Sequence, residues 1–406
     1  MTYQTHTLTN GLRIIHMPSA GNVSYCGFYV NAGTRDESDD EHGMAHFVEH
    51  MLFKGTKKRK SYHIINRMEN VGGEMNAYTN KEETVLYSSF LNEDFQRAIE
   101  LMSDMVFASE YPQREIDKEI EVVIDEIHSY EDSPSELIYD EFENLVFRGS
   151  SLGHNVLGDT GSVSSFDAQN VKSFVSRLYK PSNIVFFSLG KTDFKKVVYW
   201  AEKYMDQYPE SETLSQRAEP QKINRDFRVL KRDTTQVHAV IGGYSYSHYD
   251  TNKTILFLLN NILGGPGMNS RLNMSLREKR GLVYNVESAA TSFTDSGIFS
   301  IYFGCDKRNE QKCLDLVYKE LSKLKTEKLS LSQLAASKKQ LIGQIGVSLD
   351  NRESLALSLG KNYMCYNHYN SWEETVAKIE RVTAEQIQDV ANEIFDENNL
   401  FGLIYD

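Results

Sequence analysis

The second half of the chain repeats the order of elements that the first half shows. In the first half, a strand at 23–31 precedes helices near 44–54 and 61–70, and strands at 74–78 and 84–91 follow. At an offset of about 210 residues the same order recurs, with a strand at 236–243, helices at 253–263 and 270–279, and strands at 284–292 and 297–304. A repeat of this length predicts two similar domains.

Within each copy, two helices lie between the first strand and the next pair of strands. The pattern therefore favours an α+β fold, with an antiparallel sheet flanked by helices in each domain. Residues 209–226 are polar and charged, contain Pro209 and Pro220, and have few large apolar side chains, as is typical of a linker. We predict one domain at 1–208 and the other at 227–406.

The first predicted helix of the first copy carries the sequence His46-Phe47-Val48-Glu49-His50. Its apolar residues fall on one helical face, and they are Met44, Phe47, Val48, Met51 and Leu52. The two histidines project from the other side, four residues apart, and can bind one zinc ion with Glu49 beside it. A metal, a water and a base are the parts of a hydrolytic site.

An H-x-x-E-H pattern arises by chance in roughly one chain of this length in fifty, so the alternative is a surface helix with two solvated histidines. A third ligand would separate these readings. The predicted helix at 115–130 offers Asp125, Glu126 and His128. Glu126 is favoured because it lies, with Glu119, along the edge of the buried stripe of that helix, although it could also be an ordinary, partly exposed acid.

The second copy keeps the helix but not its polar residues. The positions that match His46, Glu49 and His50 are Phe257, Asn260 and Asn261. None of these three is a typical zinc ligand. We therefore expect only the first domain to bind metal.

Charge and composition exclude several classes of function. The formal net charge is -13 and no lysine or arginine stripe is present, which argues against nucleic acid as a partner. One basic cluster, at Lys54 and 57–60, is interpreted as a solvated loop. No apolar run approaches the roughly 20 residues that cross a bilayer, and no secretory signal is visible at the first residues, which predicts a cytoplasmic protein without a membrane partner.

The four cysteines are scattered and form no C-x-x-C pair. They are Cys26, Cys305, Cys313 and Cys365. Such a pattern indicates reduced core residues rather than a disulfide framework or a thiolate metal site.

Over its whole length the chain resembles the pitrilysin and mitochondrial processing peptidase family of zinc metallopeptidases, the inverzincins, as a half-size, bacterial-type member. The resemblance depends on 43–56 (GMAHFVEHMLFKGT), 73–77 (GEMNA), Glu119 with Glu126, 270–272 (SRL) and 277–284 (REKRGLVY). In that family the distal zinc glutamate lies 76 positions beyond the second histidine, which here is Glu126. The resemblance thus implies one Zn²⁺ per chain, held by His46, His50 and Glu126.

The resemblance also implies roles for residues around the metal. Glu49 would be the general base that deprotonates a water at the metal, and Glu119 a supporting carboxylate. The strand near 73–77, with Asn76 and Ala77, would be the edge to which an extended substrate adds. Arg277 and Tyr284 match the pair that binds substrate and stabilises the reacting carbonyl; the alternative for them is a salt bridge at a helix end and a core tyrosine.

Family members enclose a chamber between two clam-like halves of two such domains each, so this chain corresponds to one half. The resemblance therefore implies a homodimer in which each zinc meets Arg277 and Tyr284 of the partner chain, or else a heterodimer with a related half-size chain. The predicted function is a zinc metalloendopeptidase that cleaves peptides or unfolded segments. The alternatives are a non-catalytic scaffold subunit and a processing peptidase that needs a different partner.

Overall fold

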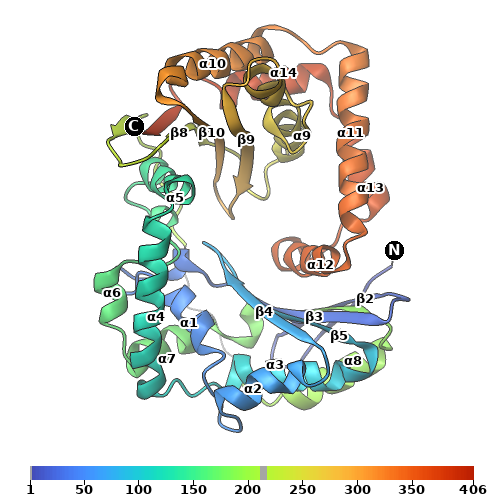
Figure 1. Cartoon of the computed structure of the whole chain (residues 1–406). Coiled ribbons are helices and arrows are strands. Elements are labelled where there is room, and N and C mark those ends of the chain that lie inside the picture. Colours follow the sequence, from blue (N-terminus) through green and yellow to red (C-terminus); the bar gives the residue numbers. More distant parts are fainter. Residues whose placement is uncertain (1, 211–216) are drawn as a thin grey trace. The chain divides into compact units, whose positions relative to one another are not determined.

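Two β-sheets, one in each of two units, organise the chain (Figure 1). The computed structural model describes residues 2–210 and 217–406. The first unit contains Met1–His128, His154–Arg217 and Ser348–Asn370, and the second contains Ser129–Gly153, Ala218–Val347 and Ser371–Asp406.

The sheet of the first unit has the strand order β1-β2-β6-β3-β5-β4. Its strands are β1 (Gln4–Thr7), β2 (Arg13–Pro18), β3 (Val23–Val30), β4 (Glu74–Thr79), β5 (Thr84–Leu91) and β6 (Ile184–Gly190). Antiparallel pairing joins all neighbours except β2 and β6, which run parallel. The strand β4 therefore lies at one end of this sheet, with only β5 beside it among the described strands.

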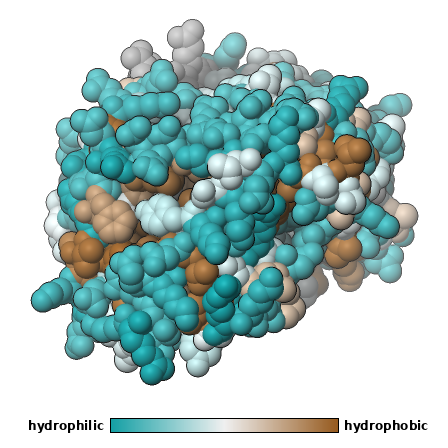
Figure 2. Space-filling model, turned by 90° about the horizontal axis from the view of Figure 1, so that it is seen from above, coloured by the Kyte–Doolittle hydropathy of each residue, from teal (hydrophilic) through white to brown (hydrophobic). Residues whose placement is uncertain are grey.

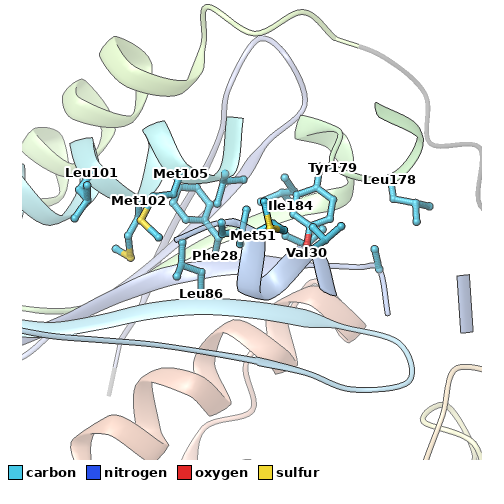
Figure 3. Packing of buried hydrophobic residues seen from close by; sticks show 14 of the residues in the cluster. Phe28, Val30, Met51, Leu86, Leu101, Met102, Met105, Leu178, Tyr179 and Ile184 are labelled. Carbon is cyan, nitrogen blue, oxygen red and sulfur yellow. The ribbon is translucent and has the colours of Figure 1, made fainter. Parts of the chain in front are cut away.

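Both faces of this sheet are buried. Its helices are α1 (Met44–Met51), α2 (Ser61–Glu69), α3 (Phe95–Ala108), α4 (Gln113–Glu131), α6 (Thr160–Ser164), α7 (Ala168–Leu178), α8 (Phe194–Met205) and α12 (Arg352–Tyr366), with short 3-10 turns at Thr34–Asp36, Asn92–Asp94 and Pro181–Asn183. Phe28 of β3 packs with Met51 of α1 and Met105 of α3 on one face (Figure 3). The next residue, Tyr29, packs on the other face against Leu359 of α12. Because side chains alternate along a strand, helices on both faces explain the continuous apolar run of β6.

The sheet of the second unit has the order β7-β11-β8-β10-β9. Its strands are β7 (Phe227–Leu230), β8 (Val237–Tyr244), β9 (Val283–Ser292), β10 (Gly297–Cys305) and β11 (Phe401–Tyr405). Its helices are α5 (Pro134–Val146), α9 (Lys253–Gly264), α10 (Glu310–Thr326), α11 (Leu331–Leu349), α13 (Trp372–Glu380) and α14 (Ala384–Ile394), with short helical turns at Ser151–Gly153, Asn273–Glu278 and Lys307–Asn309. Strand for strand, β7-β11-β8-β10-β9 matches β2-β6-β3-β5-β4, as the repeat predicts.

The two copies exchange one helix. Helix α5 follows α4 in the first copy, yet its apolar side chains, such as Ile138 and Phe142, pack against β8 and β11. Helix α12 follows α11 in the second copy, yet Leu355 and Leu359 pack on β3 and β6. Sequence periodicity shows an apolar helical face but not which sheet that face covers.

The predicted α+β class is confirmed, with sheets flanked by helices in both units. Each sheet differs from the expected antiparallel sheet by one parallel pair, β2 with β6 or β7 with β11. Along the chain, β2 and β7 are the first of the five matching strands of their copies, and β6 and β11 are the last. The long stretch of chain between the two strands of each pair allows them to run in the same direction. The division at 209–226 stays a prediction, and 211–216 of that linker lie outside the described residues.

Surface and core show two further features. No helix within 2–210 and 217–406 combines the length and the apolar character needed to cross a membrane, and the face in Figure 2 is mainly hydrophilic with apolar side chains in small groups. The cysteines Cys26, Cys305 and Cys313 are buried and form no disulfide bond.

Helix α12 approaches its sheet closely at Gly360, which predicts a measurable effect on stability. A Cβ atom at Gly360 would lie 2.5 Å from Cδ2 of Tyr29 and 2.8 Å from Cδ1 of Phe187. We expect Gly360→Ala to lower the free energy of unfolding by about 1–3 kcal/mol, because the buried helix must shift. As a control, Gly343→Ala in α11, where nothing lies within 4 Å, should raise it by about 0.5–1 kcal/mol. Urea denaturation of both variants tests the contrast; equal effects would show that α12 has room to move.

Candidate metal centre and active site

Helix α1 begins at a strained and tightly packed position. Gly43 has φ +89°, and a Cβ atom there would lie 2.6 Å from the backbone oxygen of Leu157. The buried carboxylate of Glu37 accepts hydrogen bonds from the backbone N–H groups of Gly43 and Ala45 at 3.1 and 2.9 Å. Burial raises the pKa of Glu37 well above the usual range, and the two backbone hydrogen bonds only partly oppose this shift. Glu37 thus sets the start of the helix.

The apolar face of α1 is fully buried, as the 3.6-residue periodicity predicts. This burial holds the helix in the core and fixes the direction of the opposite side. There, His46 is almost buried, with 9% of its side chain exposed, and His50 is 23% exposed. Their rings lie edge to face with centroids 4.6 Å apart.

Helix α4 brings Glu126 to the two histidines. The Oε2 atom of Glu126 lies 3.8 Å from Nε2 of His46 and 3.6 Å from Nε2 of His50. One ligand atom from each of the three residues lies within 4.8 Å of the others. The structure therefore brings together the three residues that the sequence selects as ligands, while Asp125 and His128 are exposed and belong to no such group among the described residues.

The donor set fits a zinc ion. Two imidazole nitrogens and one carboxylate oxygen are typical zinc ligands, and bonds of about 2.0–2.1 Å at tetrahedral angles place ligand atoms about 3.3 Å apart. The distances of 3.6 and 3.8 Å are close to that spacing. Three protein ligands also leave a fourth position for water or substrate, as in catalytic zinc sites.

The His46 ring is poised to bind a metal as the neutral imidazole. Burial, with the nearby His50 ring, lowers the pKa of His46 from 6.5 to about 3. Its Nδ1 atom is buried without a hydrogen-bond partner. The ring therefore offers Nε2, which faces Glu126, and no proton has to leave it near neutral pH.

The carboxylate of Glu119 orients the His50 ring. His50 Nδ1 donates to Glu119 Oε1 at 2.9 Å, which leaves Nε2 free to face Glu126. Burial lowers the pKa of His50, but the bond to Glu119 and the neighbouring carboxylates outweigh it, so that pKa is raised. Burial would raise the pKa of Glu119, but His50 and Lys54 hold it below the usual value. Such a carboxylate–histidine pair fixes ring orientation at metal sites.

Glu49 lies on the same side of α1 and is held by strand β4. Its Oε2 atom accepts a hydrogen bond of 2.6 Å from Oγ1 of Thr79. Burial raises the pKa of Glu49, and the bond from Thr79 only partly opposes this. A carboxylate with a raised pKa takes up a proton more readily near neutral pH, which suits a general base.

The other predicted site residues fall into two groups. Asn76 and Ala77 lie on β4, opposite Tyr87 and Leu86 of β5, at the end of the first sheet. Arg277 and Tyr284 belong to the second unit, where Tyr284 is 83% exposed on β9 and the Arg277 side chain is 48% exposed, 4.0 Å from Glu278. The core-tyrosine alternative for Tyr284 is therefore wrong.

The second copy has no equivalent metal group among the described residues. Phe257 is 47% exposed on α9, and Asn261 is buried.

Sequence reasoning missed two residues of the site. Thr79 gave no signal, because its partner Glu49 lies on another element. Lys54 was assigned to a solvated loop, yet its Nζ atom contacts Glu119 Oε2. Its position four residues after His50, on the same helical face, was the available signal. Arg59 of the same cluster is also not merely solvated, since it pairs with Glu100 and Asp104.

Known proteins of similar sequence agree with this picture. The family model described as "Insulinase (Peptidase family M16)" matches residues 14–160. A second model, described as "Peptidase M16 inactive domain", matches residues 165–341. A protein named uncharacterized zinc protease from Streptomyces coelicolor is 32% identical over 97% of this chain and 87% of its own length. The chain belongs to peptidase family M16. In Bacillus subtilis, the uncharacterized zinc protease YmxG is 30% identical over 98% of this chain and 97% of its own length.

Two solved structures share the fold over the whole chain. A protease from Helicobacter pylori has a TM-score of 0.90 at 20% identity and covers 100% of this chain and 99% of its own. A protein from Pseudomonas fluorescens described as a peptidase M16 inactive domain has a TM-score of 0.92 at 19% identity, with 100% and 98% covered. The likeness to these two structures shows that the fold is shared.

Proposed function

We propose that this M16 protein is a zinc metalloendopeptidase that hydrolyses peptides or unfolded polypeptide segments, with one Zn²⁺ per chain. The observation that carries the proposal is the convergence of His46, His50 and Glu126 within 4.8 Å, with Glu49 on the same helix. The names of the M16 relatives support the same activity.

In this proposal His46, His50 and Glu126 hold the ion. When bound, zinc supplies Lewis-acid chemistry, which polarises a peptide carbonyl and makes a water easier to deprotonate. Glu49 takes the proton of the attacking water and passes it to the departing amine. Thr79 keeps the Glu49 carboxylate in place for both transfers, and Glu119 keeps the His50 ring in its orientation.

Substrate would add to strand β4 as an extended strand. This strand ends the sheet, and its residues Asn76 and Ala77 have no neighbouring described strand on the outer side. Main-chain hydrogen bonds at a sheet edge recognise the backbone of a bound peptide more than its side chains. We therefore propose a broad choice of peptide sequence.

We further propose that the site is completed by a second copy of the chain. Arg277 and Tyr284 of the partner would contact the substrate, and Tyr284 would donate to the oxygen on which charge develops during attack. The high exposure of Tyr284 within its own unit leaves its hydroxyl available for such a role. The resulting homodimer encloses the reaction in a chamber.

Cleavage of an oligopeptide by the purified chain, with and without a chelator, tests the proposed function. Cleavage that the chelator stops and zinc restores would support the homodimeric peptidase. No cleavage despite bound zinc, with activity after a related chain is added, would favour the processing peptidase with a different partner. Absence of both zinc binding and cleavage would favour the scaffold.

The shared site predicts that two inactive variants restore each other. Glu49→Gln and Tyr284→Phe should each be nearly inactive as homodimers. In a mixed dimer, one of the two sites combines an intact Glu49 with an intact Tyr284. Equal mixing after subunit exchange should therefore return about a quarter of the original rate, because about half of the dimers are mixed and half of their sites are intact.

A mixture of Glu49→Gln with Glu49→Ala serves as the control, because no pairing of these chains restores a carboxylate at position 49. Recovery should be absent in that control and present only with Tyr284→Phe. If the first mixture also stays inactive although exchange is demonstrated by mass, the partner does not supply Tyr284.

A further inference from the structure

Lys54 lies at the junction between the two helices that carry the proposed metal ligands. It follows α1, and its backbone N–H donates to the carbonyl of Met51 at 3.1 Å, which continues the helix by a turn. Its side chain contacts Glu119 on α4, with 27% of the lysine side chain exposed. The contact thus links α1, with His46 and His50, to α4, with Glu126.

We propose that Lys54 is a positioning residue of the zinc site, which acts on the metal through its contact with Glu119. This inference rests on the proposed function, because it concerns the same ion.

The contacts of Glu119 carry the argument. One oxygen, Oε1, accepts from His50 Nδ1 at 2.9 Å, and the other, Oε2, contacts Nζ of Lys54. Only 5% of the Glu119 side chain is exposed. A buried carboxylate without partners is costly, so each oxygen needs its own donor. Lys54 supplies the donor that His50 cannot supply.

Two consequences for the metal follow from this arrangement. With Oε2 bound by Lys54, the carboxylate is held so that Oε1 faces His50, which keeps Nε2 of that ring directed at Glu126. The same contact keeps α4 close to the end of α1. Glu126 lies two helical turns after Glu119 on α4, so the contact also helps to set the distance between Glu126 and the two histidines.

The experiment measures zinc affinity of the full chain by competition with a chromogenic chelator. We expect Lys54→Met to weaken zinc binding by about three- to tenfold, which is less than the roughly 10- to 100-fold expected for loss of a direct partner of a ligand. Lys54→Arg should recover most of the affinity, since it keeps the charge. Lys58→Met, which removes a positive charge from an exposed position in the same segment, should stay within about twofold.

A coupling measurement separates this role from a merely structural one. In a Glu119→Ala background, Lys54→Met should change zinc affinity by less than about twofold, because no side-chain acceptor remains to link Lys54 to His50. Equal weakening in both backgrounds, or no weakening in the original one, overturns the inference. Thermal unfolding of the metal-free variants checks the fold, and Lys54→Gln is measured in parallel in case the methionine variant does not fold. If the unsubstituted chain itself binds no zinc, the proposed function fails instead.

Discussion

Replacing Glu49 with glutamine should lower kcat/KM for peptide cleavage by at least about 1000-fold, while zinc affinity stays within a few fold. The glutamine keeps the shape of the side chain, and its amide oxygen can still accept the hydrogen bond from Thr79. It cannot take a proton from water. Cleavage kinetics with an internally quenched peptide and chelator competition, on the same preparation, measure both quantities. Retained turnover with normal zinc content would remove Glu49 from the mechanism.

Thr79 provides a matched pair of controls for this result. Thr79→Ser keeps the hydroxyl that donates to Glu49 and should leave the rate nearly unchanged. Thr79→Val removes it and should lower kcat/KM by about tenfold, because the carboxylate loses a bond worth about 1–1.5 kcal/mol. If serine and valine behave alike, the hydroxyl does not position Glu49.

The helix that carries the two histidines could be predicted from the sequence, because the spacing of its apolar residues alone determines which side is buried. The apolar residues of α1 follow a helical period, so burial of that face leaves His46, Glu49 and His50 together on the other side. Glu126 was favoured over Asp125 and His128 by the same reasoning on α4. The structure brings Glu126 to the histidines because both helices bury their apolar faces in one core.

What the sequence left open depends on contacts between distant elements. In the sequence, Lys54 is one member of a run of basic residues. Its contact with Glu119 could not be predicted, because it depends on the packing of α4 beside the end of α1. Thr79 reads as an ordinary strand residue until β4 is placed next to α1. Likewise, the sequence of α12 does not indicate which sheet its buried side chains cover, and its packing on β3 and β6 of the other copy has no local signature.

The second large effect is expected on zinc affinity when the carboxylate of Glu126, rather than that of its neighbour Asp125, is removed from α4. Glu126→Gln should weaken zinc binding by about two to three powers of ten, since apparent zinc affinities of about 10–16 kcal/mol shared by four ligands correspond to roughly 2.5–4 kcal/mol for each. Peptide cleavage at low zinc should fall with it and partly return when zinc is raised, because the general base is intact. Metal analysis after dialysis, with rates over a zinc titration, measures this.

Asp125→Asn is the matched control for this variant, because it removes the same charge one residue earlier on the same helix. Asp125 is exposed and lies outside the group formed by His46, His50 and Glu126. Its loss should therefore change zinc affinity by less than about twofold, through weak long-range attraction that 0.15 M salt largely screens. If both variants weaken zinc binding equally, Glu126 acts through its charge rather than as a ligand, and the third ligand must be sought elsewhere. A large effect of Glu126→Gln alone requires direct contact between that carboxylate and the ion, because only a bonded oxygen distinguishes one acid from its neighbour so sharply.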